Sequence, residues 1–319
     1  MIKRRKIQMS STQIILLSFL IVILVGSILL SLPISAKNGK ISYIDALFTA
    51  TTATCVTGLV TVSTASSWSV FGQVIILILI QIGGLGVITI LTAFMLMINK
   101  KIGISDRLLI QDAFNLNTLS GLVVFVKRVL LGTLIIEFIG ALFYMIVFIP
   151  EFGVRGIWIS IFNSISAFCN AGMDIIGETS LYNYATNPII NITTSILIIL
   201  GGLGYIVWWD IIRVIKLKKN GKYKFFKHLT LHSKIALCST MILIVFGAIT
   251  TLVFEYSNDL TIHNMSFFDK IQVSFFQSIT TRTAGFATIP QENLTNATAI
   301  SSMILMFIGG SPVGTAGGV

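Results

Sequence analysis

Charged residues are scarce in this chain. Asp, Glu, Lys and Arg make up 11% of its 319 residues, whereas 55% are hydrophobic. Soluble domains carry about 25% charged residues, and the mean hydropathy here is +0.92. The shortage of charge excludes a water-soluble surface over most of the chain and predicts a protein of the lipid bilayer.

Cysteine and histidine are also few. The three cysteines form no disulfide framework, and the three histidines show no metal-ligand spacing. The sequence contains no phosphate-binding loop, zinc-protease or nucleophile-elbow motif. Catalysis inside a membrane would need a set such as Ser/His or paired Asp on facing helices, and none is visible. We therefore expect neither an enzyme nor a resident cofactor or metal.

The charges that are present indicate the topology. Basic residues number four at 3–6, five from Lys100 to Arg128 and eight from Arg213 to Lys234, each group beside an apolar run. This is the positive-inside pattern, which predicts a cytoplasmic N-terminus and two cytoplasmic connections in a multi-pass protein of the cell membrane. The net charge of +10 does not indicate nucleic acid, because no aromatic residues are interleaved with the basic ones.

Apolar runs of about 20 residues are long enough to span a bilayer. They occur at roughly 12–34, 70–98, 122–149, 188–212, 233–255 and 297–319. The external connections between them are unusual, since residues 46–99 carry no charge although 46–69 are rich in Thr, Ser and Gly. Irregular backbone at membrane depth is tolerated where it lines a cavity or is buried in protein. We therefore expect re-entrant loops, in which a short helix descends and an extended strand returns.

The external segments repeat a common pattern. Each has a Phe ten residues before a glycine, and the glycines Gly58, Gly172 and Gly285 recur at intervals of 114 and 113 residues. A glycine pair follows each of them, at 83–84, 201–202 and 309–310. Matched landmarks in three segments indicate an internal repeat. The predicted fold is an all-α membrane protein of helix–pore loop–helix units around a central pore.

The predicted organisation has six parts. They are a cytoplasmic tail (1–11), a first repeat (12–98), a cytoplasmic linker (99–121), a second repeat (122–216), a basic cytoplasmic loop (217–232) and a third, incomplete repeat (233–319).

The repeated glycine suits cation binding. Backbone carbonyls can replace the water around a cation where several strands point at one axis, and glycine adopts the required backbone angles at little cost. The C-terminal end of each descending helix adds partial negative charge. We expect an ion path lined by the main-chain oxygens of Val56, Thr57, Gly58, Leu59, Asn170, Ala171, Gly172, Met173, Thr283, Ala284, Gly285 and Phe286.

The motifs TTATCVTGL, SAFCNAGMD, TTRTAGFAT and GGSPVGTAGG resemble those of the Trk/Ktr/HKT superfamily, and most closely its Ktr-type potassium transporter subunit. The resemblance covers essentially the whole chain. It implies four repeats around one pore, with Gly58, Gly172 and Gly285 matching the first three filter glycines. It also implies potassium uptake, with sodium as a possible coupled ion, a homodimer, and a cytosolic nucleotide-binding regulatory ring.

The resemblance further implies a gate, a broken stretch in the second helix of the third repeat. The local sequence agrees, because Pro312 and the surrounding glycines cannot sustain a helix. The matching residues are Gly309, Gly310, Ser311, Gly314, Thr315, Gly317 and Gly318.

The sequence departs from the family pattern at its end, where no fourth repeat follows. We expect a fragment or truncated reading frame of a protein longer by about 110–130 residues, which does not conduct selectively unless a complementary piece is supplied. One alternative is a non-conducting fragment that only associates with membrane subunits. Another is a secondary transporter of a small solute, although the spans hold few charges.

Three further ionisable residues bear on the proposed path. Asp174 either concentrates cations at the outer mouth or is a solvated external carboxylate. Arg282 is interpreted as a structural clamp behind the filter, because a cation facing the pore would repel potassium. Glu137 lies inside a predicted span, where an ionisable group is either functional or part of a contact between repeats.

Overall fold

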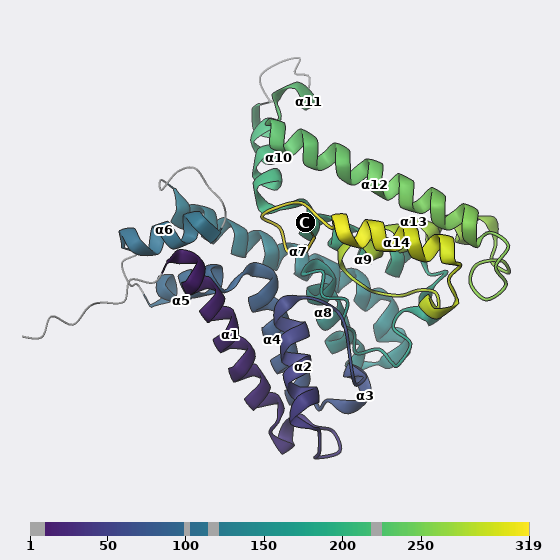
Figure 1. Ribbon diagram of the computed structural model, residues 1–319, viewed down its shortest axis with the longest axis horizontal. Coiled ribbons are helices and arrows are strands. Elements are labelled where there is room, and N and C mark those ends of the chain that lie inside the picture. Colours follow the sequence, from purple (N-terminus) through teal and green to yellow (C-terminus); the bar gives the residue numbers. More distant parts are fainter. Residues whose placement is uncertain (1–9, 99–102, 114–120, 218–224, 319) are drawn as a thin grey trace, which may run out of the picture.

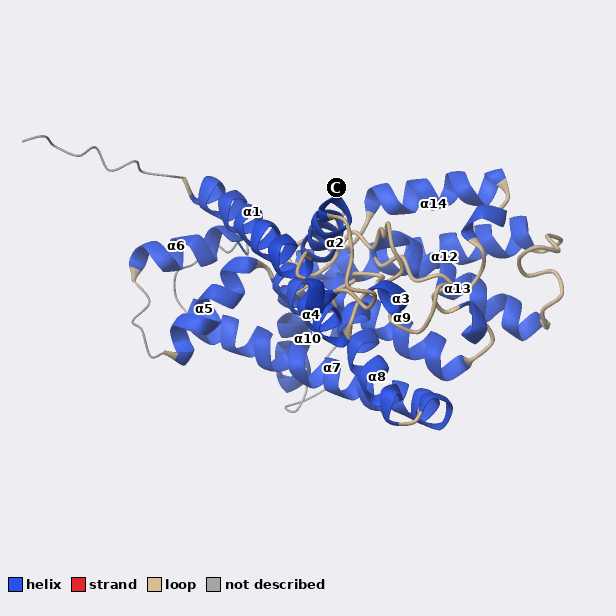
Figure 2. Cartoon of the chain, turned by 90° about the horizontal axis from the view of Figure 1, so that it is seen from below, coloured by secondary structure: helices blue, strands red, loops and turns tan. Residues whose placement is uncertain are grey.

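The computed structural model describes residues 10–98, 103–113, 121–217 and 225–318, and these fold almost entirely into helices (Figure 2). Within these ranges the extended backbone pairs only at an isolated bridge between Ala36 and Trp68. The predicted all-α class is confirmed for this part of the chain. Helices suit a bilayer, because each backbone amide and carbonyl finds its partner inside its own segment.

The first group of helices begins with a long apolar helix and a shorter one. Ser10 and Ser42 cap these two by accepting hydrogen bonds from the amides of Gln13 and Asp45. The elements are α1 (Ser11–Leu30), the 3-10 helix η1 (Pro33–Ser35), α2 (Tyr43–Cys55), α3 (Thr64–Ser67), α4 (Val70–Leu85) and α5 (Val87–Met97).

The second group has the same order. Its long helix ends at Gly153, where the chain turns directly into the shorter helix. The elements are α7 (Leu122–Phe152), α8 (Val154–Phe168), the 3-10 helix η2 (Tyr182–Tyr184), α9 (Pro188–Leu203) and α10 (Tyr205–Leu217), preceded by α6 (Ile104–Ala113).

The third group lies along one side of the molecule (Figure 1). Ser266 caps its shorter helix through the amide of Asp269, as Ser42 does through Asp45 in the first group. The elements are α11 (Phe225–His228), α12 (Leu231–Glu255), α13 (Phe267–Thr283), the 3-10 helix η4 (Gln291–Asn293) and α14 (Asn296–Ile308).

The helices differ in whether they are long and apolar enough to cross a membrane. By length and composition, α1, α7 and α12 could each cross a bilayer, and the count over the described residues rises to five if each of two bent pairs is one span. The pairs are α4 with α5, bent by 101°, and α9 with α10, bent by 96°. The bends fall at Gly86 and Gly204, where φ is 82° and 86°. The predicted runs at 70–98 and 188–212 are therefore two helices each, and α14 has 13 residues.

Small residues allow the long and short helices of a group to approach closely. In the second group, an added Cβ at Gly140 of α7 would overlap Ser164 of α8, and in the third, one at Gly247 of α12 would overlap Ser278 of α13. Both serine hydroxyls donate to a carbonyl of the long helix, that of Glu137 at 2.6 Å and that of Ile244 at 2.8 Å. Small residues with interhelical hydrogen bonds are typical of helix packing in membranes.

The outward faces of the long helices are apolar. Leu131 and Phe138 on α7 are 61% and 64% exposed, and Ile242 on α12 is 66% exposed. Large apolar surfaces of this kind indicate contact with lipid or with another protein.

Candidate functional site

The loops that follow α2, α8 and α13 begin with similar turns. The amide of Thr57 donates to the carbonyl of Thr52, and the amide of Ala171 donates to that of Ser166, each five residues back. The third loop makes the same five-residue bond from Gly285 to Thr280. In the first two loops the donor is the residue before the glycine, whereas in the third loop the donor is the glycine itself.

The structure brings the three loops together at their glycines. Gly58, Gly172 and Gly285 all have positive φ, at 77°, 63° and 93°. A Cβ at Gly58 would lie 2.8 Å from the carbonyl oxygen of Ala171 and 3.2 Å from that of Ala284. A Cβ at Gly172 would overlap the Ala284 oxygen and lie 3.1 Å from the Cα of Gly285. Gly58 and Gly172 cannot be replaced without displacing backbone, because the atoms nearest to an added Cβ are backbone atoms of the neighbouring loops.

Side chains of the predicted filter residues lie in two kinds of environment. Asn170, Ala171, Met173, Ala284 and Phe286 are buried. Leu59 of the first loop is 65% exposed, and Thr57 is exposed as well. The second and third loops are therefore held by packing behind them, whereas the first presents side chains to the surface of the described chain.

A cavity of about 280 Å³ touches all three glycines. Its wall also includes Asp174 and Glu178, which follow the second loop. The amide of Ile176 donates to Oδ1 of Asp174 at 3.2 Å, and burial raises the pKa of this carboxyl above its ordinary value. The arrangement places acidic groups beside the point where the three loops meet.

The segment 309–318 is an irregular loop that packs against the break between α9 and α10. The amides of Ser311 and Thr315 donate to the carbonyls of Gly202 and Gly201 at 2.9 and 3.1 Å. In return, the amide of Tyr205 donates to the carbonyl of Val313 at 3.0 Å. Together with residues 83–86, Val313 and Gly314 line a second cavity of about 280 Å³. The loop is thus fixed by backbone hydrogen bonds to the α9–α10 break, and Figure 1 shows it running from the end of α14 toward the C-terminus.

Two ionisable side chains inside the helical body have defined partners. Arg282 donates from Nε and Nη2 to the carbonyl oxygen of Gly309, where the loop begins. Glu137 is 4% exposed and accepts hydrogen bonds from Nε2 of Gln81 at 3.0 and 3.2 Å. Arg282 therefore contacts the loop, and Glu137 joins α7 to α4.

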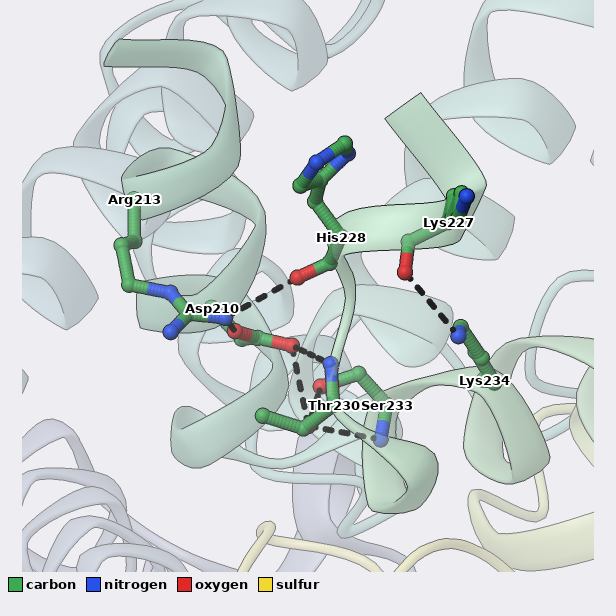
Figure 3. Close-up of polar contacts among 7 residues, drawn as sticks. All are labelled: Asp210, Arg213, Lys227, His228, Thr230, Ser233 and Lys234. Carbon is green, nitrogen blue, oxygen red and sulfur yellow. Dashed lines mark hydrogen bonds and ion pairs between the residues drawn. The ribbon is translucent and has the colours of Figure 1, made fainter. Parts of the chain in front are cut away.

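The basic connection from α10 to α12 is built around one buried carboxylate (Figure 3). Oδ1 of Asp210 accepts from Arg213 at 2.6 Å, and Oδ2 accepts from the amide and hydroxyl of Thr230 at 2.8 and 2.9 Å. Lys234 donates to the carbonyl of Lys227 at 3.2 Å. These contacts fix the start of α12. The rest of the predicted basic loop, 218–224, lies outside the described residues.

The described residues contain no group of three or more His, Cys, Asp or Glu side chains that could hold a metal ion. The site predicted from the sequence uses backbone oxygens, and its role on an ion path stays a prediction. Sequence reasoning did not find the contacts of the Asn170 side chain with Thr283 and Thr315, or those of the Ser164 and Ser278 hydroxyls, because these partners are remote in sequence.

Comparison with known proteins identifies cation transport proteins at the level of the family and of individual relatives. The family TrkH, described as "Cation transport protein", matches residues 3–319. The potassium/sodium uptake protein NtpJ of Enterococcus hirae is 43% identical over 319 residues, which are 99% of this chain and 68% of that protein. The Ktr system potassium uptake protein B of Bacillus subtilis is 38% identical over 314 residues, 98% of this chain and 68% of that protein.

A solved structure is similar as well. The potassium transporter TrkH from Vibrio parahaemolyticus superposes with a TM-score of 0.73 at 15% identity, covering 99% of this chain and 60% of that one. At this identity the likeness concerns the fold alone. The chain thus spans about two thirds of the length of the relatives it matches.

Proposed function

Since this chain belongs to the TrkH family of cation transport proteins, we propose that it mediates potassium uptake across the cell membrane. The observation that carries this proposal is the meeting of the three glycine loops: an added Cβ at Gly58 would lie 2.8 and 3.2 Å from the carbonyl oxygens of Ala171 and Ala284. Relatives at 43% and 38% identity are named for potassium uptake. The family is one of transporters, and the chain needs neither catalysis nor a cofactor for this role.

In the proposed path, the carbonyl oxygens of the residues at 56–59, 170–173 and 283–286 take the place of the water around the ion. Positive φ at Gly58, Gly172 and Gly285 supports this role, because alternating backbone angles allow successive carbonyls to turn toward one axis. The C-terminal ends of α2, α8 and α13 lead into these strands, and their partial negative charge favours a cation.

The loop 309–318 serves as the gate in this proposal. It lines one cavity while the three glycines line another, so it is placed to control passage between them. Hydrogen bonds from Ser311 and Thr315 to the α9–α10 break hold it in one position. A loop held by a few hydrogen bonds can move without unfolding the helices around it.

We further propose a cytoplasmic N-terminus, a homodimer, and a cytosolic nucleotide-binding ring as regulatory partner. The basic clusters support the orientation, and the relatives from Bacillus subtilis are named as parts of a Ktr system. Sodium enters the proposal as a coupled or alternative ion, because one relative is named a potassium/sodium uptake protein.

Complementation tests the function. A bacterial strain lacking potassium uptake should grow on low potassium when it carries the gene at its full genomic length, and Gly172→Ser should abolish the discrimination between potassium and sodium in a rubidium-uptake assay. Gly132→Ser, within α7 where an added Cβ comes no closer than 3.7 Å to Trp208, is the matched control. Normal selectivity in Gly172→Ser would reject the path.

A further inference from the structure

A buried amide joins the second filter strand to the loop at 309–318. The Asn170 side chain is fully buried. Its Nδ2 donates to the Thr315 hydroxyl at 2.8 Å and to the carbonyl of Phe168 at 3.2 Å. Its Oδ1 accepts from the Thr283 hydroxyl at 2.7 Å. One side chain therefore contacts the end of α8, the end of α13 and the loop.

Thr315 completes this arrangement from the loop side. Its side chain is 6% exposed, and the hydroxyl that accepts from Asn170 donates to the carbonyl of Phe168 at 2.8 Å. Its backbone amide donates to Gly201. Glycine is required at position 201, because an added Cβ would overlap the Phe168 carbonyl oxygen and lie 2.5 Å from the Thr315 hydroxyl. The Thr315 hydroxyl thus donates one hydrogen bond and accepts another, both with buried groups of the protein.

The residues held by Asn170 are next to the oxygens of the proposed filter. Asn170 itself has φ of +60° and precedes Ala171, whose carbonyl oxygen approaches Gly58. Thr283 precedes Ala284, whose oxygen approaches Gly58 and Gly172. Moving the loop removes the Thr315 hydroxyl and leaves the Asn170 amide and the Phe168 carbonyl short of a partner in a buried place. Such groups are costly to leave unsatisfied.

We propose that Asn170 is a positioning residue that couples the filter to the loop. A cation in the filter and a docked loop then stabilise each other, because both require the same position of the Asn170 amide. By linkage the effect works in both directions: filling the filter holds the loop, and releasing the loop loosens the second and third filter strands. This inference rests on the proposed function, since it takes the three loops to be the cation site.

Hydrogen–deuterium exchange of the full chain in lipid nanodiscs tests the coupling. In the unsubstituted protein, potassium in place of N-methylglucamine should slow exchange in the segments 56–59 and 170–173 and also in 309–318. Thr315→Val keeps the side-chain volume and removes the hydroxyl. Its loop should exchange roughly tenfold faster and should no longer respond to potassium, while the filter segments still do. Thr315→Ser restores the hydroxyl and should restore the response.

The matched control is Thr250→Val, which removes a hydroxyl that donates to the carbonyl of Gly247 within α12 and should leave both responses unchanged. Where Thr315→Val does not fold, Thr315→Ala is measured in its place, because it removes the same hydroxyl. A loop that still responds to potassium in these variants would overturn the coupling alone. A lack of potassium response in the filter segments of the unsubstituted protein would overturn the proposed function and the coupling together.

Discussion

The guanidinium of Arg282 donates two hydrogen bonds to the carbonyl oxygen of Gly309, at 3.1 and 2.7 Å. Arg282 lies in the last turn of α13, where the negative end of the helix dipole favours a cation. The same side chain therefore lies at the end of α13 and holds the start of the loop. This contact agrees with a clamp rather than with a group that faces the ion path.

Arg282→Gln should release the start of the loop. Charge-assisted hydrogen bonds are worth about 1.5–3 kcal/mol, and a glutamine replaces two of them by one neutral bond at most. We expect basal rubidium efflux from proteoliposomes to rise roughly tenfold. Arg128→Gln is the control, because Arg128 stacks over Trp209 at 5.8 Å and does not contact the loop. Unchanged efflux in a folded Arg282→Gln protein would contradict the clamp.

Alanine substitutions at Gly58, Gly172 and Gly285 should differ in severity. At Gly172 the added Cβ overlaps the Ala284 oxygen, at Gly58 it lies 2.8 Å from the Ala171 oxygen, and at Gly285 it meets no atom of the described chain within 4 Å. All three bear the cost of positive φ, about 1–2 kcal/mol, but only the first two also displace backbone. The expected order of lost potassium selectivity is Gly172, then Gly58, then Gly285, measured as the ratio of rubidium to sodium uptake. Equal losses at the three sites would show that the contact distances do not matter.

Much of the fold could be predicted from local sequence. Glycines spaced by 114 and 113 residues revealed the repeat because each loop needs positive φ at that position. The resemblance to the Trk/Ktr superfamily is confirmed by the match to TrkH over residues 3–319. The glycine pairs near Gly86 and Gly204 were noticed as a repeat, but the bends of 101° and 96° were not expected, because hydropathy continues across each break.

The polar contacts between different elements of the fold could not be predicted. Thr315 and Asn170 are 145 residues apart, and Arg282 and Gly309 are 27 apart. Periodicity reports which face of a helix is apolar, but it does not report which distant carbonyl or amide a polar side chain reaches. For the same reason, the interhelical bonds of Ser164 and Ser278 are visible only in the folded chain.

Asp174→Asn should weaken cation capture at the mouth of the proposed path. Asp174 lines the cavity that touches the three glycines, and a carboxylate there raises the local cation concentration. We expect the apparent KM for rubidium uptake to rise about threefold at low ionic strength, and the difference to vanish at about 1 M choline chloride because salt screens the charge. Glu292→Gln, which changes an external carboxylate that is not part of this cavity, is the control.

The effect of Asp174 should also depend on pH. Burial raises the pKa of its carboxyl above the ordinary value of 3.8, so the folded protein takes up this proton at a higher pH than an exposed aspartate would. The charge is therefore present at high pH and is lost as the pH falls through the raised pKa. The KM values of the parent and Asp174→Asn proteins should converge on acidification. A difference that persists after the parent carboxyl is protonated would reject the electrostatic explanation.

Asp210→Asn should destabilise the connection between α10 and α12. The two carboxylate oxygens of Asp210 accept from Arg213 and from the amide and hydroxyl of Thr230. An asparagine keeps one oxygen and turns an NH₂ group toward the remaining donors, which leaves at least one of them unsatisfied at a cost of about 1–3 kcal/mol. The expected result is a melting temperature in detergent lower by several degrees, measured by loss of the monodisperse peak in size-exclusion chromatography after heating. Asp259→Asn is the matched control, because its side chain is 76% exposed and its nearest ionic contact is His263 at 3.6 Å. Asp210 fixes the start of α12, and α12 packs against α13 and α14. A melting temperature equal to that of the control would therefore mean that the third group is held by its helix packing and not by this carboxylate.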